Sequence, residues 1–269
     1  MINVLHRIFL WLVILFPLSA ASQIFEIEQI EKSFVINNEP SITFLYPAQN
    51  PKALLVFIPG GEGTAGVKRD WGSHSRYFST YPFNRMLASL ANSQLTEGTI
   101  SVVIFDSPKS LGSGNYLALR GATDHMVRLE STINFYKNKF GLPVWLMGHS
   151  AGGVSVGEFT NYLIKNKKEN LISGMIFSAG RKDSKFINTY NIPSLFIIHQ
   201  DDACSITLPQ QNKEIFEAFK PKNKSITEFQ MVAGGQPQGD PCSTGYHMYF
   251  GSEPEVARAL SLFINQHNP

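Results

Sequence analysis

Charge and cysteine are scarce in this sequence. Only 16% of the 269 residues are charged, the formal net charge is +2, and the chain has 2 cysteines. Without a long run of one charge sign we expect no nucleic-acid partner, and the lysine groups at 165–168 and 220–224 are interpreted as solvated faces or helix ends. Two cysteines are too few for a zinc ribbon. No internal repeat is visible, and the 43% apolar content suffices for one domain with a sizeable core.

The N-terminal apolar run is too short to cross a bilayer. Residues 1–7 are basic, residues 8–18 are apolar over about half the required length, and small residues follow at 19–22. This order is typical of a secretory signal peptide cleaved near Ala21. We therefore expect a signal peptide at 1–21, a mature domain at 22–269, a secreted or periplasmic location and no stable membrane span after cleavage. The alternative is an uncleaved anchor.

The expected export affects the redox state of the two cysteines, Cys204 and Cys242. In an oxidising compartment an even cysteine count favours a disulfide. The alternative is two separate buried thiols.

Short, continuous apolar runs follow one another along the chain. Such runs are typical of strands that are covered on both faces, as in a parallel sheet. Residues 25–46 are interpreted as two earlier strands, of which Ser41–Tyr46 is the clearer. The continuous runs lie at 53–58, 100–105, 144–147, 172–177 and 194–198.

Apolar residues at helical spacing predict helices between these runs. The last helix is expected to start at Ser252, with Pro254 in its first turn and Glu255 completing a capping box. Alternating strands and helices predict a mostly parallel, doubly wound α/β sheet with helices on both faces. The gap at 178–193 is too short for a large lid domain. The helical stripes are Met126, Leu129, Ile133, Tyr136 and Phe140; Tyr162 and Leu163; Ile215, Phe216 and Phe219; and Val256, Leu260 and Phe263.

The stretch WLMGHSAGG, residues 145–153, places Ser150 in a G-x-S-x-G turn between a predicted strand and a predicted helix. Such a turn strains the serine backbone, and the close approach of strand and helix requires glycine at positions 148 and 152. The amides that start the helix favour negative charge near the serine oxygen. We therefore predict that Ser150 is a nucleophile; the alternative is a structural glycine-rich turn.

With this turn the sequence resembles the α/β-hydrolase family over nearly the whole mature chain. The resemblance implies the order serine, acid, histidine along the chain. It places the histidine before the last helix, which points to His247 in GYHMYFG. A serine hydroxyl needs such a base within hydrogen-bond reach. His199, at the end of a strand, would be structural, and His267 lies in the C-terminal tail.

The resemblance places the acid after the strand at 194–198, where the chain reads HQDDACS. We prefer Asp202 to Asp201 on spacing, although Gln200 stands where the family often has glycine. Asp240, beside a proline, is interpreted first as a turn former. A disulfide between Cys204 and Cys242 would then tie the acid loop to the histidine loop.

The glycine loop FIPGGEGTAG, residues 57–66, contains G-x-G-x-x-G. It lacks the acidic residue that a dinucleotide site requires about twenty positions later, and it lacks the Lys-Ser or Lys-Thr of a P-loop. The resemblance implies instead an oxyanion hole made by the amides of Gly61 and Ala151, with Glu62 as an alternative donor. The polar and aromatic stretch at 64–82 would line a substrate cleft or cover the sheet edge.

These residues predict a secreted or periplasmic serine hydrolase of carboxylic esters, acting through an acyl-enzyme with Ser150, His247 and Asp202. No metal or organic cofactor is expected, and the substrate is a small-molecule or polymeric ester. The alternatives are a peptidase or amidase with the same triad, and a catalytically inactive binding protein on the hydrolase scaffold.

Overall fold

The computed structural model describes residues 26–30, 40–63, 82–92, 95–108 and 115–269. The predicted signal peptide lies outside the described residues. So do residues 64–81 of the polar and aromatic stretch.

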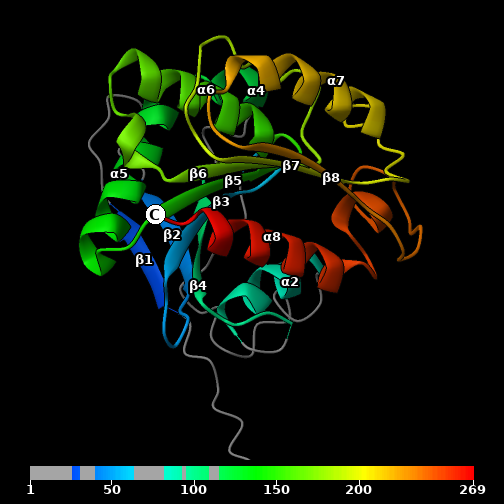
Figure 1. Cartoon of the computed structure of the whole chain (residues 1–269), viewed down its shortest axis with the longest axis horizontal. Helices are drawn as coiled ribbons and strands as arrows, with labels where there is room; N and C mark the ends of the chain where they lie inside the picture. The colour runs from blue at the N-terminus through cyan, green and yellow to red at the C-terminus, as the bar shows by residue number, and fades with distance from the viewer. Residues whose placement is uncertain (1–25, 31–39, 64–81, 93–94, 109–114) are drawn as a thin grey trace, which may run out of the picture.

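One mixed sheet of 8 strands forms the centre of the molecule, in the order β1-β2-β4-β3-β5-β6-β7-β8 (Figure 1). The first two pairings, β1 with β2 and β2 with β4, are antiparallel, and every later pairing is parallel. The predicted, mostly parallel sheet is therefore confirmed. The strands are β1 (Glu26–Ile30), β2 (Ser41–Tyr46), β3 (Ala53–Ile58), β4 (Ile100–Asp106), β5 (Val144–His149), β6 (Gly174–Ser178), β7 (Ser194–His199) and β8 (Thr227–Val232).

The continuous apolar runs form the inner strands because helices cover both faces of the sheet there. Every residue of β3, β4, β5, β6 and β7 is buried. Strand β8 was not predicted. It lies at the sheet edge and most of its residues are exposed or half-buried, so it lacks the continuous apolar pattern that marks the others.

Two layers of helices enclose the sheet. Helices α2 and α8 pack on one face, and α4, α5, α6 and α7 lie on the other (Figure 1). Residues 178–193, between β6 and β7, contain no helix, as expected for a fold without a large lid inserted there. The helices are α2 (Pro82–Ala91), α4 (Tyr116–Leu119), α5 (Thr123–Phe140), α6 (Gly152–Lys165), α7 (Pro209–Phe219) and α8 (Glu253–His267), with 3-10 turns η1 (Glu169–Leu171), η2 (Lys220–Lys222) and η3 (Gly245–Met248).

The start of α8 differs from the prediction in one detail. Ser252 is the N-cap residue and Pro254 lies in the first turn, but the Ser252 hydroxyl donates to the carbonyl of Tyr249 at 3.2 Å and does not cap the helix. The predicted capping box with Glu255 is therefore wrong. Tyr249, which lies 3 residues before Ser252, explains the difference, because it turns the chain with a φ of 58° and offers its carbonyl to the buried Ser252. Val256, Leu260 and Phe263 are buried, as predicted.

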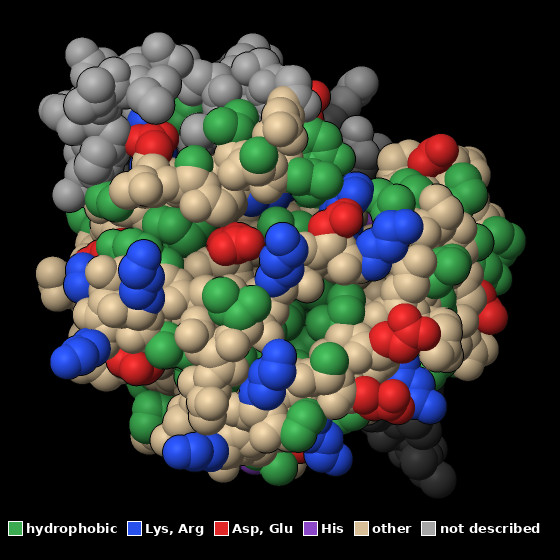
Figure 2. All heavy atoms as spheres, turned by 90° about the horizontal axis from the view of Figure 1, so that it is seen from above, with side chains coloured by type: hydrophobic (Ala, Val, Ile, Leu, Met, Phe, Trp, Pro, Cys, Tyr) green, Lys and Arg blue, Asp and Glu red, His purple; other side chains and the backbone are tan. Residues whose placement is uncertain are grey.

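The surface over α5, α6 and α7 carries mixed charges. Figure 2 shows Lys and Arg side chains interspersed with acidic and polar ones on this side of the molecule. Lys168 pairs with Glu130 at 2.6 Å, and Lys165 and Lys167 are exposed. Among the described residues, no helix has the length and apolar character needed to cross a membrane.

A buried polar cluster lies between α5 and α6. The Nε2 atom of His125 lies 2.9 Å from the Ser155 hydroxyl, and the His125 ring meets the Phe105 ring edge-on at 5.8 Å. Burial lowers the pKa of His125 to about 3, and the neighbouring cations Arg120 and Arg128 act in the same direction. His125 is therefore uncharged at neutral pH.

Replacing His125 by Gln should change how stability depends on pH. A folded pKa below the unfolded value means that the unfolded chain binds the extra proton between about pH 6.5 and 3, so stability falls as the pH falls through this window. The histidine contributes a slope of roughly 1.4 kcal/mol per pH unit. We expect the difference in unfolding free energy between wild type and His125→Gln to shrink from pH 7 to pH 4 in urea titrations. Parallel curves would contradict this assignment.

Candidate active site

Ser150 sits on a strained turn between β5 and α6. Its φ is 54°, a conformation that non-glycine residues rarely adopt. Backbone hydrogen bonds hold the turn, because the Ser150 amide donates to the carbonyl of Ser178 at 2.9 Å and the Ser150 carbonyl accepts from Gly153 at 3.0 Å. Strain that is held in this way is typical of functional positions.

Two glycines allow this turn to form. A Cβ on Gly148 would lie 2.2 Å from the carbonyl oxygen of Gly152, and a Cβ on Gly152 would lie 2.2 Å from the carbonyl oxygen of Ile58 in β3. The backbones of β3, β5 and α6 therefore touch at this point. The close approach predicted from the G-x-S-x-G motif is confirmed at both glycines.

Asp202 and His247 form a buried pair next to the carboxyl end of the sheet. His247 Nδ1 lies 2.8 Å from Asp202 Oδ2, and the two residues are only 1–2% exposed. The other carboxylate oxygen accepts from the amide of Cys204 at 2.9 Å. A carboxylate accepts at Nδ1, so the ring holds its proton there and keeps a lone pair on Nε2.

Thr207 belongs to the same group, although the sequence analysis did not single it out. Its hydroxyl donates to Asp202 Oδ2 at 3.1 Å and lies 3.2 Å from His247 Nδ1. A threonine in a loop carries no motif, and only the folded loop brings it to the carboxylate.

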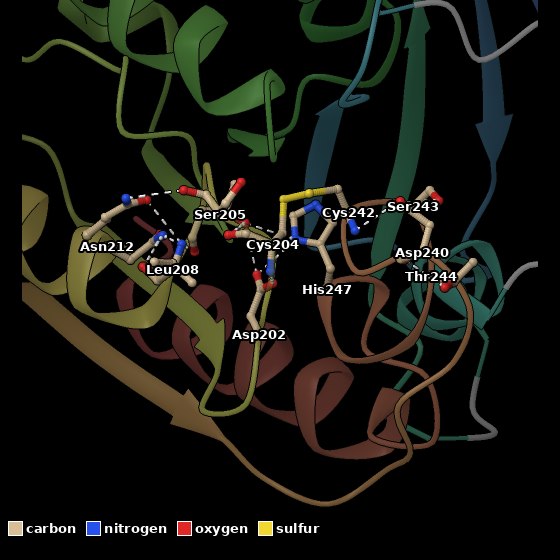
Figure 3. The surroundings of a disulfide bond; sticks show 12 residues. Asp202, Cys204, Ser205, Leu208, Asn212, Asp240, Cys242, Ser243, Thr244 and His247 are labelled. Atoms are coloured by element: carbon tan, nitrogen blue, oxygen red, sulfur yellow. Dashed lines mark hydrogen bonds and ion pairs between the residues drawn. A yellow bond between two sulfur atoms is a disulfide. The ribbon is translucent and has the colours of Figure 1, made fainter.

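Cys204 and Cys242 form a disulfide, with Cα atoms 4.6 Å apart. The alternative of two separate buried thiols is therefore wrong. Figure 3 shows the bridge between the chain segments that carry Asp202 and His247.

The competing acids and histidines lie outside this pair. Asp201 is exposed and contacts Gln200 at 3.3 Å. Asp240 accepts from the amide of Cys242 at 2.9 Å, which lowers the pKa of Asp240, and the residue forms a turn. His199 is buried against Tyr246 and has Nε2 2.7 Å from the Gly234 carbonyl. His267 contacts Glu228 near the chain end.

The His247 ring lies next to the residue that precedes Ser150. The ring centroids of His149 and His247 are 4.8 Å apart. Within the described residues, the hydrogen bonds of His247 all involve Nδ1, and the Ser150 hydroxyl makes none. The structure therefore contains no hydrogen bond between the side chains of Ser150 and His247.

His149 is itself held by a buried chain of hydroxyl groups. The Tyr249 hydroxyl donates to the Ile197 carbonyl at 3.0 Å and lies 2.9 Å from Ser178, whose hydroxyl lies 3.1 Å from His149 Nδ1. Burial, together with nearby His247, keeps the pKa of His149 well below its usual range. Burial also raises the pKa of Tyr249. This network packs behind His247 and was not predicted, because its residues lie in four separate segments.

The glycine loop after β3 lies against the serine. A Cβ on Gly60 would lie 2.9 Å from Ser150 Cβ, so the loop and the turn are in contact. Gly61 has a φ of 54° in a turn closed by a bond from the Gly63 amide to the Gly60 carbonyl at 3.0 Å. Ala151 is buried and directly precedes α6. No group of three His, Cys, Asp or Glu side chains suited to a metal ion occurs in the described part of the chain.

Comparisons with known proteins identify the fold. No family model matches the sequence, and no curated protein matches it. Solved structures do match. An α/β serine hydrolase without a lid from Xanthomonas campestris has a TM-score of 0.55 at 15% identity, with 91% of this chain and 95% of that chain covered.

Two further structures have the same architecture. A soluble variant of the monoglyceride lipase of Saccharomyces cerevisiae matches with a TM-score of 0.61 at 14% identity, covering 94% of this chain and 99% of that one. An esterase of Pyrobaculum calidifontis matches with a TM-score of 0.58 at 12% identity, covering 90% and 84%. The chain therefore has the fold of the α/β-hydrolase superfamily.

Replacing Gly152 by Ala should disrupt the turn, because the new Cβ would meet the Ile58 carbonyl of the central sheet. We expect a loss of about 3 kcal/mol or more in the free energy of unfolding, measured by urea titration. Gly141→Ala is the matched control. Gly141 has a φ of 66° with no atom within 4 Å of the new Cβ, so only conformational strain of roughly 1–2 kcal/mol applies. Equal losses in the two variants would contradict the steric argument.

Proposed function

We propose that this protein is a serine hydrolase that cleaves carboxylic esters through an acyl-enzyme. The observation that carries the proposal is the buried Asp202–His247 pair, 2.8 Å apart, whose histidine ring contacts His149, the residue before the serine on the strained, glycine-flanked turn. A hydroxyl nucleophile, an imidazole base and an orienting carboxylate together form the catalytic unit of acyl transfer. The hydrolase and esterase neighbours are consistent with this proposal.

The proposed reaction uses Ser150, His247 and Asp202. The Ser150 oxygen attacks the acyl carbon while His247 Nε2 takes its proton, and Asp202 supports the resulting imidazolium. The imidazolium returns the proton to the leaving alcohol, and water, activated by the same base, releases the acid. The hydrogen bond between Ser150 and His247 forms on substrate binding, as catalytic contacts often tighten only in the complex.

The amides of Ala151 and Gly61 complete the proposed site by binding the oxyanion. Ala151 adjoins the N-terminus of α6, whose first turn contains no acidic residue that would oppose the negative charge. Preorganised donors of this kind lower the barrier because they need no reorganisation when the charge develops.

We also propose that the protein is exported and works outside the cytoplasm, with residues 1–21 as a cleaved signal peptide. The disulfide supports this location, since such bridges persist in oxidising compartments.

A fluorophosphonate probe tests the nucleophile directly. We expect labelling of Ser150 in the folded protein, none in Ser150→Ala, and a fall of roughly 10⁴-fold in kcat for His247→Ala and Asp202→Asn on p-nitrophenyl esters. Asp201→Asn is the matched control and should keep wild-type kcat, because its carboxylate is exposed and away from His247. Equal loss in Asp201→Asn would contradict the choice of Asp202.

The same assay separates the competing functions. Wild-type turnover of p-nitrophenyl esters without turnover of p-nitroanilides supports the esterase. The reverse preference would identify a peptidase or amidase, and a folded protein that takes no label would be a binding protein.

Loss of the disulfide should affect both stability and catalysis. The bridge closes a loop of 38 residues, which corresponds to roughly 3–4 kcal/mol in the chain-entropy model. The amide of Cys204 also holds the Asp202 carboxylate. In the double variant Cys204→Ala, Cys242→Ala we expect a lower Tm and a lower kcat on p-nitrophenyl esters at temperatures where the variant is folded. An unchanged kcat with a lower Tm would limit the bridge to stability.

A further inference from the structure

Arg120 is a buried cation behind the glycine loop. It follows the short helix α4, is 3% exposed, and donates from Nη2 to the carbonyls of Pro59 at 3.0 Å and Gly61 at 2.8 Å. Its Nη1 atom donates to the Ser155 hydroxyl on α6 at 2.8 Å. One guanidinium thus joins the loop after β3 to the helix that follows Ser150.

Among the described residues, no carboxylate forms an ion pair with Arg120. Within the described residues its recorded partners are two carbonyls and one hydroxyl, and its Nε atom is buried without a partner. Burial lowers the pKa of Arg120 to about 10, with Arg181 acting in the same direction and Tyr116 opposing. The group remains protonated at neutral pH. Burying an unpaired charge is unfavourable, so its place requires an explanation.

Arg128 provides the contrast. It is equally buried, on α5, but its Nε atom pairs with Asp124 at 2.8 Å and its Nη1 atom reaches the Ser41 hydroxyl at 3.3 Å. Arg128 is an ordinary structural arginine with a carboxylate partner. Within the part of the chain that the structure describes, Arg128 forms no hydrogen bond with residues 60–63 of the glycine loop.

The glycine loop needs an external support. Three of its four residues at 60–63 are glycine, the residue type with the most backbone freedom. The peptide that carries the Gly61 amide lies between the two carbonyls that Arg120 holds, those of Pro59 and Gly61. With both neighbouring peptide planes fixed, and with its own carbonyl bonded to Gly63, this central peptide has little freedom to turn.

We propose that Arg120 is the positioning residue of the oxyanion hole: it fixes the peptide planes on either side of the Gly61 amide and supplies positive charge behind them. This inference rests on the proposed hydrolase function. The effect is specific to the transition state, since the oxyanion is absent from the bound ester. Arg120 touches no reacting atom and acts only through the loop.

The test compares Arg120→Met with Arg128→Met, two buried arginines replaced by an apolar chain of similar length. For Arg120→Met we expect kcat on a p-nitrophenyl ester to fall by roughly 10²-fold with little change in KM, as for the loss of one oxyanion donor. Inhibition by an alkyl boronic acid, which forms a tetrahedral anion on the serine, should weaken by a similar factor. Arg128→Met should be less stable but keep kcat per folded molecule. Equal losses of kcat in both variants, or an unchanged kcat in Arg120→Met, would overturn the proposal.

Two further measurements keep the proposal testable if Arg120→Met does not fold or if the wild type hydrolyses no ester. If Arg120→Met does not fold, Arg120→Lys keeps the charge but lacks the second nitrogen of the guanidinium, so it cannot join the two carbonyls to Ser155 as Arg120 does. We expect an intermediate kcat, and wild-type kcat in Arg120→Lys would overturn the positioning role. Hydrogen exchange of the 57–63 segment needs no activity. It should speed up in Arg120→Met or Arg120→Lys and not in Arg128→Met. Faster exchange in a protein whose wild type hydrolyses no ester would reject the proposed function alone, and unchanged exchange would reject the role of Arg120.

Discussion

The contact of three backbones at the end of β5 is the constraint on which the rest of the site depends. Gly152 lies against the Ile58 carbonyl of β3, and Gly148 lies against Gly152. Because no side chain fits between these segments, the position of Ser150 follows from the packing of the sheet and α6. The same contact brings Gly60 against Ser150, so the positions of the proposed nucleophile and of the glycine loop follow from one packing feature.

Asp202 and His247, the proposed acid and base, are positioned in a different way. Asp202 and His247 lie 45 residues apart in loops after β7 and β8, outside the regular hydrogen bonding of the sheet. Their placement relies on the disulfide, on Thr207 and on the bond from the Gln236 amide to the Phe250 carbonyl at 3.1 Å, which closes the histidine loop at its base. A covalent bridge is useful here because long loops lose much conformational freedom on ordering.

The sequence was sufficient to predict the central parts of this arrangement. Continuous apolar runs marked the inner strands, and the glycines of the turn marked Ser150, because both patterns follow from local burial and sterics. The edge strand β8 and helix α2 were missed. Strand β8 is largely exposed and carries no comparable pattern. Helix α2 does carry an apolar stripe at helical spacing, Phe83, Met86, Leu87 and Leu90, which the sequence analysis overlooked.

The supporting residues were beyond the reach of local patterns. Thr207, Ser178, Tyr249 and Arg120 carry no motif, and each contributes through contacts with residues far away in the chain. The choice between Asp201 and Asp202 rested on family spacing. Burial now separates them: Asp202 is inside beside His247, whereas Asp201 faces solvent.

The distribution of charge around Ser150 matches the charge movement of the proposed reaction. On one side a carboxylate contacts the ring that becomes a cation, and the ring of His149 beside it stays uncharged because burial keeps its pKa low. On the other side a buried guanidinium stands behind the loop where the anion forms. If the carboxylate stood behind the loop and the guanidinium beside the histidine, neither the imidazolium nor the oxyanion would be stabilised. The unfavourable burial of Arg120 is therefore consistent with a role in that step, whereas a purely structural contact could use a neutral donor.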